Sequence, residues 1–252
     1  MSDGHTRGRP RRRILHTSDL HLNKSGEEAC DSLEAVVSLA VLRNVDMVII
    51  AGDLFDQVRV AEDMVSFTLE QLHQLPMPVV ILPGNHDCLL PGSVLRRPEF
   101  QPDGGNIHLI TSPVGETLHF PGLGITVWGK CIDSHDDVRP MAGIPPPEDS
   151  RQWNVAVAHG YFVSTHPPLF PSYHITRDEI AGSGWDYVAL GHIPVFRCVC
   201  REPVMAYYSG SPEVSGTVAM VELDDQTGVQ VTCCELEPVP PAETAGPPDA
   251  GE

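Results

Sequence analysis

The sequence predicts an α/β protein with a largely parallel sheet, and three observations lead to that class. In the first half of the chain, apolar strand-like runs alternate with amphipathic helical segments, and each expected strand ends in polar residues. A strand–helix–strand–helix–strand order with right-handed crossovers sets parallel strands side by side. The hydrophobic share of 41% is enough for a substantial core, and 252 residues suit one large domain or two small ones.

The first half contains three expected strands and two expected helices. The strands are 13–18, 47–51 and 79–82, and the helices are 27–44 and 61–75. Both helical segments place their apolar residues on one face at the period of an α-helix. The run 47–51 is apolar throughout, which is typical of a parallel strand that is covered on both faces.

The second half predicts short strands that are connected by loops. The expected strands are 107–110, 125–129, 155–158, 187–190, 205–208, 218–223 and 229–234, with a hairpin turn at 225–228 between the last two. The stretch 133–151 is rich in Pro, Asp and Gly, and it predicts a long surface loop. We expect a basic disordered tail over 1–12, a disordered tail of Pro, Ala, Glu and Gly over 238–252, and a folded domain over 13–237.

The composition limits the compartment and the partners. No apolar stretch has membrane-spanning length, and the basic N-terminal segment lacks the apolar run of a secretory signal. Seven cysteines are an odd number, which argues against a disulfide framework and favours a reducing, cytoplasmic location. The net charge of −18 argues against broad, non-specific binding to phosphate backbones.

Four of the cysteines raise the alternative of a zinc site. Cys198 and Cys200 alternate on one expected strand and should share a face, whereas Cys233 and Cys234 are adjacent and should point to opposite faces. At most three of the four thiols can therefore converge. We favour buried or half-buried thiols over a zinc site.

Polar residues collect at the carboxyl ends of five expected strands. They are Asp19 and His21, Asp53, Asn85 and His86, His159, and His192. Open α/β sheets build their sites at this end of the strands, so we expect these residues on one rim of a sandwich. Carboxylate, imidazole and amide groups form a mixed oxygen and nitrogen donor set, which suits Mn, Fe, Zn or Co better than Ca or Mg alone. A carboxylate can bridge two such ions about 3.5–4 Å apart, and that geometry activates a water while holding a phosphoryl group.

The order Asp-x-His, Gly-Asp, Gly-Asn-His-Asp, His-Gly and Gly-His resembles the signature of calcineurin-like metallophosphoesterases. Within that superfamily the chain is most similar to SbcD-type DNA repair nucleases, through the segments 16–22, 52–56, 82–87 and 208–213. The resemblance covers roughly 12–236. It implies a four-layer α/β/β/α sandwich, with the metallophosphoesterase domain over 13–237.

The resemblance also implies the role of each residue. Two divalent metal ions are expected, with Mn favoured and Fe, Zn or Co as alternatives. One ion would be bound by Asp19 and His21, the other by Asn85, His159 and His192, and Asp53 would bridge both. His86 would contact the scissile phosphate, and Asp56 matches the position that often orients this histidine. A carboxylate partner fixes the tautomer of an imidazole and raises its pKa.

The chain departs from the family pattern in two places. The usual last motif is Gly-His-x-His, but here Pro194 stands where the second histidine would bind the first metal. His135, His166 and His174 lie on expected loops and are candidates to replace it, although each fits a surface histidine better. Nuclease relatives also carry a DNA-binding cap after the region of 210–212, where we expect here only a hairpin and a tail.

These observations predict a metal-dependent phosphoesterase, and a diesterase in preference to a monoesterase. The acidic body and the missing cap favour a small or single-stranded phosphodiester over duplex DNA. One alternative is an SbcD-like DNA exonuclease or endonuclease in DNA repair. Another is a scaffold of the same fold that has lost metal ligands and binds a protein partner. No membrane is expected as a partner, and an SbcC-like ATPase partner and the oligomeric state are left open.

Overall fold

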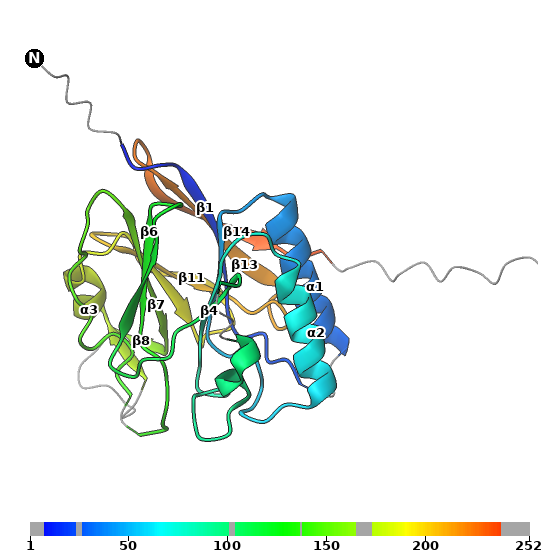
Figure 1. The fold of residues 1–252 in the computed structure, drawn as a ribbon. Helices are drawn as coiled ribbons and strands as arrows, with labels where there is room; N and C mark the ends of the chain where they lie inside the picture. The colour runs from blue at the N-terminus through cyan, green and yellow to red at the C-terminus, as the bar shows by residue number, and fades with distance from the viewer. Residues whose placement is uncertain (1–7, 24–26, 101–103, 137, 165–172, 238–252) are drawn as a thin grey trace, which may run out of the picture.

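The fold is a four-layer α/β/β/α sandwich, in which two six-stranded sheets pack between layers of helix (Figure 1). The computed structural model describes residues 8–23, 27–100, 104–136, 138–164 and 173–237. Two helices cover the outer face of the first sheet, and a short third helix lies on the opposite side of the molecule, against the second sheet. In the part of the chain that the structure describes, no helix is long and apolar enough to cross a membrane.

The first sheet contains the strand–helix units that the sequence predicts. Its strand order is β14-β13-β1-β2-β3-β4, with β1 to β4 parallel, β13 antiparallel to β1, and β14 antiparallel to β13. The strands are β1 (Arg12–Thr17), β2 (Met47–Ala51), β3 (Val79–Leu82), β4 (Ile107–Leu109), β13 (Thr217–Asp224) and β14 (Gly228–Glu235). The helices are α1 (Glu27–Leu42) and α2 (Glu62–His73). Predicted and observed bounds differ by no more than two residues in these elements.

The second sheet has the strand order β11-β12-β10-β7-β6-β5, with its four central strands parallel and both edges antiparallel. Its strands are β5 (Glu116–Phe120), β6 (Ile125–Gly129), β7 (Trp153–His159), β10 (Tyr187–Gly191), β11 (Phe196–Cys200) and β12 (Met205–Ser209). A two-stranded sheet pairs β8 (Tyr161–Val163) with β9 (His174–Thr176). The 3-10 helices η1 (Val94–Arg96) and η2 (Pro98–Phe100) follow β3.

The strand list that we drew from the sequence omits several short elements of the second half. The edge strand β5 buries only Phe120 of its five residues, so it lacks the apolar run that marks a buried strand. The helix α3 (Arg177–Gly182) is too short for a periodic pattern. It did carry one local signal, because Thr176 and Glu179 form a reciprocal capping box at its first turn.

The cysteines of β11 do not share a face, which corrects the sequence expectation. A register shift lies between Cys198 and Cys200 in the pairing of β11 with β12. Such a bulge adds a residue to one strand and breaks its alternation. As a result, Cys198 packs against the core between the sheets, whereas Cys200 belongs to the smaller core near α3. Cys233 is exposed, and Cys234 is partly buried.

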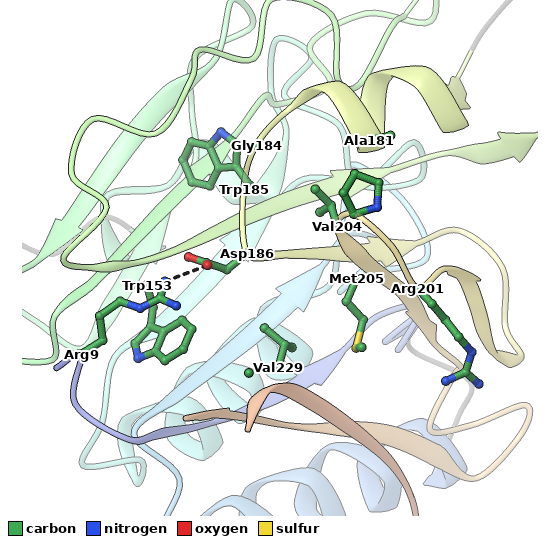
Figure 2. A pocket seen from close by; sticks show the side chains of 12 residues that line it. Arg9, Trp153, Ala181, Gly184, Trp185, Asp186, Arg201, Val204, Met205 and Val229 are labelled. Atoms are coloured by element: carbon green, nitrogen blue, oxygen red, sulfur yellow. Dashed lines mark hydrogen bonds and ion pairs between the residues drawn. The ribbon is translucent and has the colours of Figure 1, made fainter. Parts of the chain in front are cut away.

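Residues 8–12 lie against the domain, although the sequence places them in a tail. The guanidinium of Arg9 stacks over the ring of Trp153, 3.5 Å from the ring centroid, and its Nη1 lies 2.7 Å from Asp186 Oδ1 (Figure 2). Arg9 Nε lies 3.0 Å from Asp225 Oδ1. These contacts join the first strand to the amino ends of β7 and β10. This end of the sandwich is opposite the rim where the predicted site residues lie.

Replacing Arg9 with alanine should lower the free energy of unfolding by roughly 1–2 kcal/mol, because a cation–π contact and a half-buried ion pair are lost together. Urea denaturation, followed by tryptophan fluorescence, measures the change. The matched control is Arg11→Ala, since the Arg11 side chain is 64% exposed and its ion pairs are longer. The control should shift stability by less than about 0.5 kcal/mol. Equal effects of the two substitutions would contradict the prediction.

Candidate active site

The residues predicted for the site lie together at the carboxyl ends of β1, β2, β3, β7 and β10, on one rim between the two sheets. Asp19, His21 and Asp53 form one group whose candidate ligand atoms lie within 4.8 Å of one another. Asp53, His159 and His192 form a second such group. Asp53 belongs to both, so a single buried carboxylate joins the two halves of the site.

The loop backbone at this rim has an unusual conformation. Asp19, His21, Asp53 and His192 have positive φ values of 55°, 48°, 52° and 99°. They make up four of the six non-glycine residues with positive φ in the described chain. Side chains crowd the backbone in this region of φ, and strain of this kind concentrates at functional sites. The backbone N–H of Asp19 donates to Gly52 O at 3.0 Å and that of His21 to Asp53 O at 3.1 Å, which fixes the loops of β1 and β2 together.

Glycines let the loops approach one another closely. A Cβ atom on Gly52 would overlap the ring of His159, and one on Gly84 would overlap the carboxylate of Asp53. A Cβ on Gly191 would overlap the backbone oxygen of Ala51. The glycines of the Gly-Asp, Gly-Asn-His and Gly-His motifs therefore have a steric cause, since a larger residue at these positions would push the loops of the rim apart.

The half-site around Asp19 is assembled from β1 and the loop after β10. The carboxylate of Asp19 accepts hydrogen bonds from the Ser18 hydroxyl and from the backbone N–H of His192, the latter at 3.0 Å. His21 Nε2 lies 3.9 Å from Asp19 Oδ1 and 4.0 Å from Asp53 Oδ2. These three side chains leave room for a cation between them, because their separations exceed hydrogen-bond distance.

The half-site around Asn85 brings several hydrogen-bond acceptors together. His159 Nδ1 lies 2.8 Å from the backbone oxygen of Ala51, so this nitrogen carries the proton and donates it. His159 Nε2 then faces Asp53 Oδ2 at 3.2 Å and Asn85 Oδ1 at 3.0 Å. His192 Nδ1 lies 2.8 Å from the same Asn85 oxygen. In a neutral His159, Nε2 has only a lone pair, so acceptors would face acceptors unless a proton or a metal ion lies among them.

The charges of the site also call for a proton or a metal ion among these groups. Burial raises the pKa of Asp19. Burial also opposes ionisation of Asp53, but the charge of His159 and the hydrogen bonds from His159 and His86 outweigh it and hold the Asp53 pKa well below its usual range. Burial would lower the pKa of His159, and Asp53 raises it to about 9 despite that. The metal-free site thus holds a positive charge on His159, and the donor set fits a divalent cation in its place.

His86 lies at the mouth of the site. Its backbone N–H donates to Asp53 Oδ1 at 2.9 Å, and its side chain is 43% exposed. Its Nδ1 lies 2.9 Å from the backbone oxygen of Asp56, whereas the Asp56 carboxylate is 3.5 Å away. That carboxylate is closer to His21 Nδ1, at 3.3 Å. The orienting contact that the sequence assigned to the Asp56 side chain therefore comes first from its peptide oxygen.

Asp87 is a residue of the site that the sequence analysis quoted without a role. It is fully buried, its Oδ1 accepts from the N–H of Gly84 at 2.7 Å, and its Oδ2 accepts from the N–H of Phe55 at 3.1 Å. It thereby ties the loop after β3 to the loop after β2. Burial raises the pKa of this carboxyl to about 7. The signal was an aspartate two residues after Asn85, a residue type that often bonds to turn backbone.

The structure brings no histidine to the place that Pro194 leaves, among the residues that it describes. His135 contacts Cys88 Sγ at 3.7 Å and the Tyr173 hydroxyl at 3.3 Å, and His174 is buried in β9. Neither belongs to the donor groups found in the described part of the chain. His166 lies outside the described residues. The half-site of Asp19 therefore keeps Asp19, His21 and Asp53 as its candidate donors.

A model of the family described as calcineurin-like phosphoesterase matches residues 12–196, and the chain belongs to this family. The family implies divalent metal ions, in accord with the donor groups of the rim. Among curated proteins, the chain is 25% identical to the uncharacterized metallophosphoesterase YhaO of Bacillus subtilis, over 79% of this chain and 53% of that protein. It is 27% identical to the SbcD component of the nuclease SbcCD from the same organism, over 79% of this chain and 61% of that protein.

The chain thus spans between half and two thirds of the length of these two relatives. A solved structure, TT1561 of Thermus thermophilus, superposes with a TM-score of 0.58 at 14% identity, over 90% of this chain and all of that one. A likeness at this identity supports the fold, and it agrees with the four-layer sandwich that the sequence predicts.

The affinity for Mn should rise with pH. His159, with a pKa of about 9, is protonated at neutral pH in the metal-free protein, and a bound ion must replace that proton. The apparent Kd for Mn, measured by titration calorimetry, should fall about tenfold per unit between roughly pH 6 and pH 8 if one proton is released. His159→Asn should bind Mn more weakly and lose most of this slope. An unchanged slope in that variant would assign the proton to another group.

Proposed function

We propose that the protein is a metal-dependent phosphodiesterase that uses two divalent ions, with Mn as the favoured metal. The observation that carries this proposal is the position of Asp53, a buried carboxylate that is shared by two groups of candidate ligands. When bound, two ions supply a nucleophilic water at neutral pH and neutralise the charge of the phosphoryl group. Fe, Zn and Co suit the same donors.

The side chains of the two half-sites would hold the two ions in different ways. Asp53 draws both halves of the site together, while the bond of His159 Nδ1 to the oxygen of Ala51 directs the Nε2 of that ring inward. Asn85 adds a neutral oxygen, so that half-site has less negative charge than the half-site of Asp19. The second half-site has four donors, and the first has three. We therefore expect the ion near Asn85 to be held more firmly.

His86 is the candidate that acts on the substrate. It is half exposed at the mouth, and the peptide oxygen of Asp56 holds its Nδ1. This contact leaves Nε2 as the ring nitrogen for the phosphate, either to stabilise its charge or to protonate the leaving oxygen. A histidine can do either near neutral pH. The half-exposed position fits a group that meets a substrate from solvent.

The substrate that fits this chain is a small or single-stranded phosphodiester, since a net charge of −18 opposes the long-range attraction of duplex DNA. A second candidate is DNA nuclease activity in repair, which is favoured by the similarity to a component of a nuclease. A cytoplasmic location is an expectation from the sequence, and partnership with an SbcC-like ATPase is left open. The scaffold alternative loses weight because the candidate ligands of five strand ends converge.

Asp53→Asn should abolish nearly all metal-dependent hydrolysis, because the shared carboxylate is lost from both half-sites. Hydrolysis of bis(4-nitrophenyl) phosphate with added Mn gives the rate, and elemental analysis gives the bound metal. Asp31→Asn, at an exposed position of α1, is the matched control and should keep the wild-type rate. Full activity of Asp53→Asn would contradict the two-ion proposal. A wild-type protein that binds no metal would favour the scaffold.

His86→Asn should retain metal and lose on the order of 10²–10⁴-fold in kcat, because acid–base assistance is removed while the metal ligands stay in place. The loss should grow as the leaving group becomes a weaker acid. Diesters with alkyl and nitrophenyl leaving groups, compared under the same Mn concentration, measure this dependence. An equal loss for all leaving groups would assign His86 to charge stabilisation instead of proton donation.

A further inference from the structure

Tyr161 is a partly exposed aromatic residue at the edge of the candidate active site. It follows the ligand-bearing end of β7, with only Gly160 between it and His159. Its ring lies edge-on to the ring of His192, with 4.0 Å between the centroids. The residue is 38% exposed, which places it among the large apolar side chains that the protein leaves open to solvent. One imidazole ring therefore separates Tyr161 from the shared oxygen of Asn85.

The backbone on both sides of Tyr161 is fixed by one buried residue. The hydroxyl of Tyr208 accepts the N–H of Phe162 at 2.7 Å and donates to the oxygen of Gly160 at 2.7 Å. The N–H of Tyr161 itself donates to the oxygen of Tyr173 at 2.6 Å. Tyr208 is buried, so water does not compete for these bonds. The backbone that carries the Tyr161 ring is therefore fixed, which lowers the conformational entropy lost when this part of the site binds a ligand.

A second tyrosine, Tyr173, also packs against the ring of His192. The ring of Tyr173 lies nearly parallel to that of His192, at 21°, with 6.2 Å between the centroids. Its φ is 61°, a conformation that a bulky residue rarely adopts and that is most often found where a site requires it. The Tyr173 hydroxyl contacts His135, so this ring has a structural partner beyond the mouth of the site. Of the two rings, Tyr161 is the more exposed.

A fixed aromatic ring beside a phosphoester site can stack on a planar ring of the substrate. A role limited to packing on His192 would be met by a smaller apolar side chain, without leaving an aromatic ring open to water. In a nucleoside phosphate one sugar separates the base from the phosphorus, and here one imidazole separates Tyr161 from the donors. Stacking on tyrosine tolerates every base, since each has a flat π face.

We propose that Tyr161 is a specificity-determining residue that stacks on an aromatic ring carried by the ester, a nucleobase being the biological case. The inference rests on the proposed phosphodiesterase function, and it names the substrate class as nucleoside phosphoesters or short single-stranded nucleic acid. The acidic charge of the chain fits a substrate with few phosphates. The stacked ring gives affinity that does not depend on phosphate contacts.

The test compares two phosphates that differ only in the base. Titration calorimetry measures the binding of thymidine 5′-monophosphate and of 2-deoxyribose 5-phosphate to the Mn-saturated protein. The wild type should bind the nucleotide about tenfold more tightly than the sugar phosphate. In Tyr161→Ala this ratio should fall to about one through weaker nucleotide binding, and Tyr161→Phe should keep the ratio. Val114→Ala, at an 80% exposed position in the connection before β5, is the control and should leave the ratio unchanged.

The outcomes separate this proposal from the proposed function. A wild-type protein that prefers neither phosphate, or a Tyr161→Ala variant that weakens both phosphates equally, would overturn the stacking role while phosphate binding itself stands. Phenyl phosphate tests whether the stacked ring must be a nucleobase. If any aromatic ring suffices, phenyl phosphate should also bind more tightly than 2-deoxyribose 5-phosphate. Absence of Mn-dependent binding of either phosphate would overturn the proposed function, and the stacking role would fall with it.

Discussion

The contact between Asp53 and His159 is the interaction on which the rest of the site depends. Asp53 follows a strand of the first sheet and His159 ends a strand of the second, and their charged groups meet at 3.2 Å. The same histidine donates its other ring proton to the oxygen of Ala51 at 2.8 Å, so it is anchored twice to the first sheet. This pair sets the distance between the sheets at the rim, and every other donor takes its place around it.

Burial gives this pair its electrostatic character. In water the attraction would be small, but here Asp53 and His159 are almost fully shielded, and each shifts the pKa of the other in favour of the charged form. The positive charge on His159 compensates carboxylates that would otherwise be costly to bury. A divalent ion offers the same compensation with more charge. A cation, whether the charged His159 or a bound ion, would offset the cost of burying this cluster of acceptors.

The two sides of the rim differ in chemistry. On the side of Asp19, the half-site has three candidate donors, because Pro194 stands where the family pattern has a histidine. On the side of His192, Tyr161 and Tyr173 enclose the imidazole with aromatic rings. A phosphoryl group between the ions would thus meet different surroundings at each end.

The sequence by itself determined the alternation of strands and helices in the first half, the position of the donors at strand ends, and the sandwich through its resemblance to a known family. Local signals suffice for these, because apolar runs mark buried strands and polar residues after them mark one rim. It did not reveal α3 or β5, whose signals are short. The bulge between Cys198 and Cys200 was also hidden, because a register shift depends on the neighbouring strand.

Only the tertiary structure decided the contacts that surround these donors. It aimed the Asp56 carboxylate toward His21, made Asp87 join two loops, and set Tyr161 against His192. These contacts join loops that are distant in the sequence, and the pair of Asp53 and His159 joins the two sheets. Sequence spacing carries no information on how two sheets are rotated and spaced against each other, and the packing of their side chains fixes both.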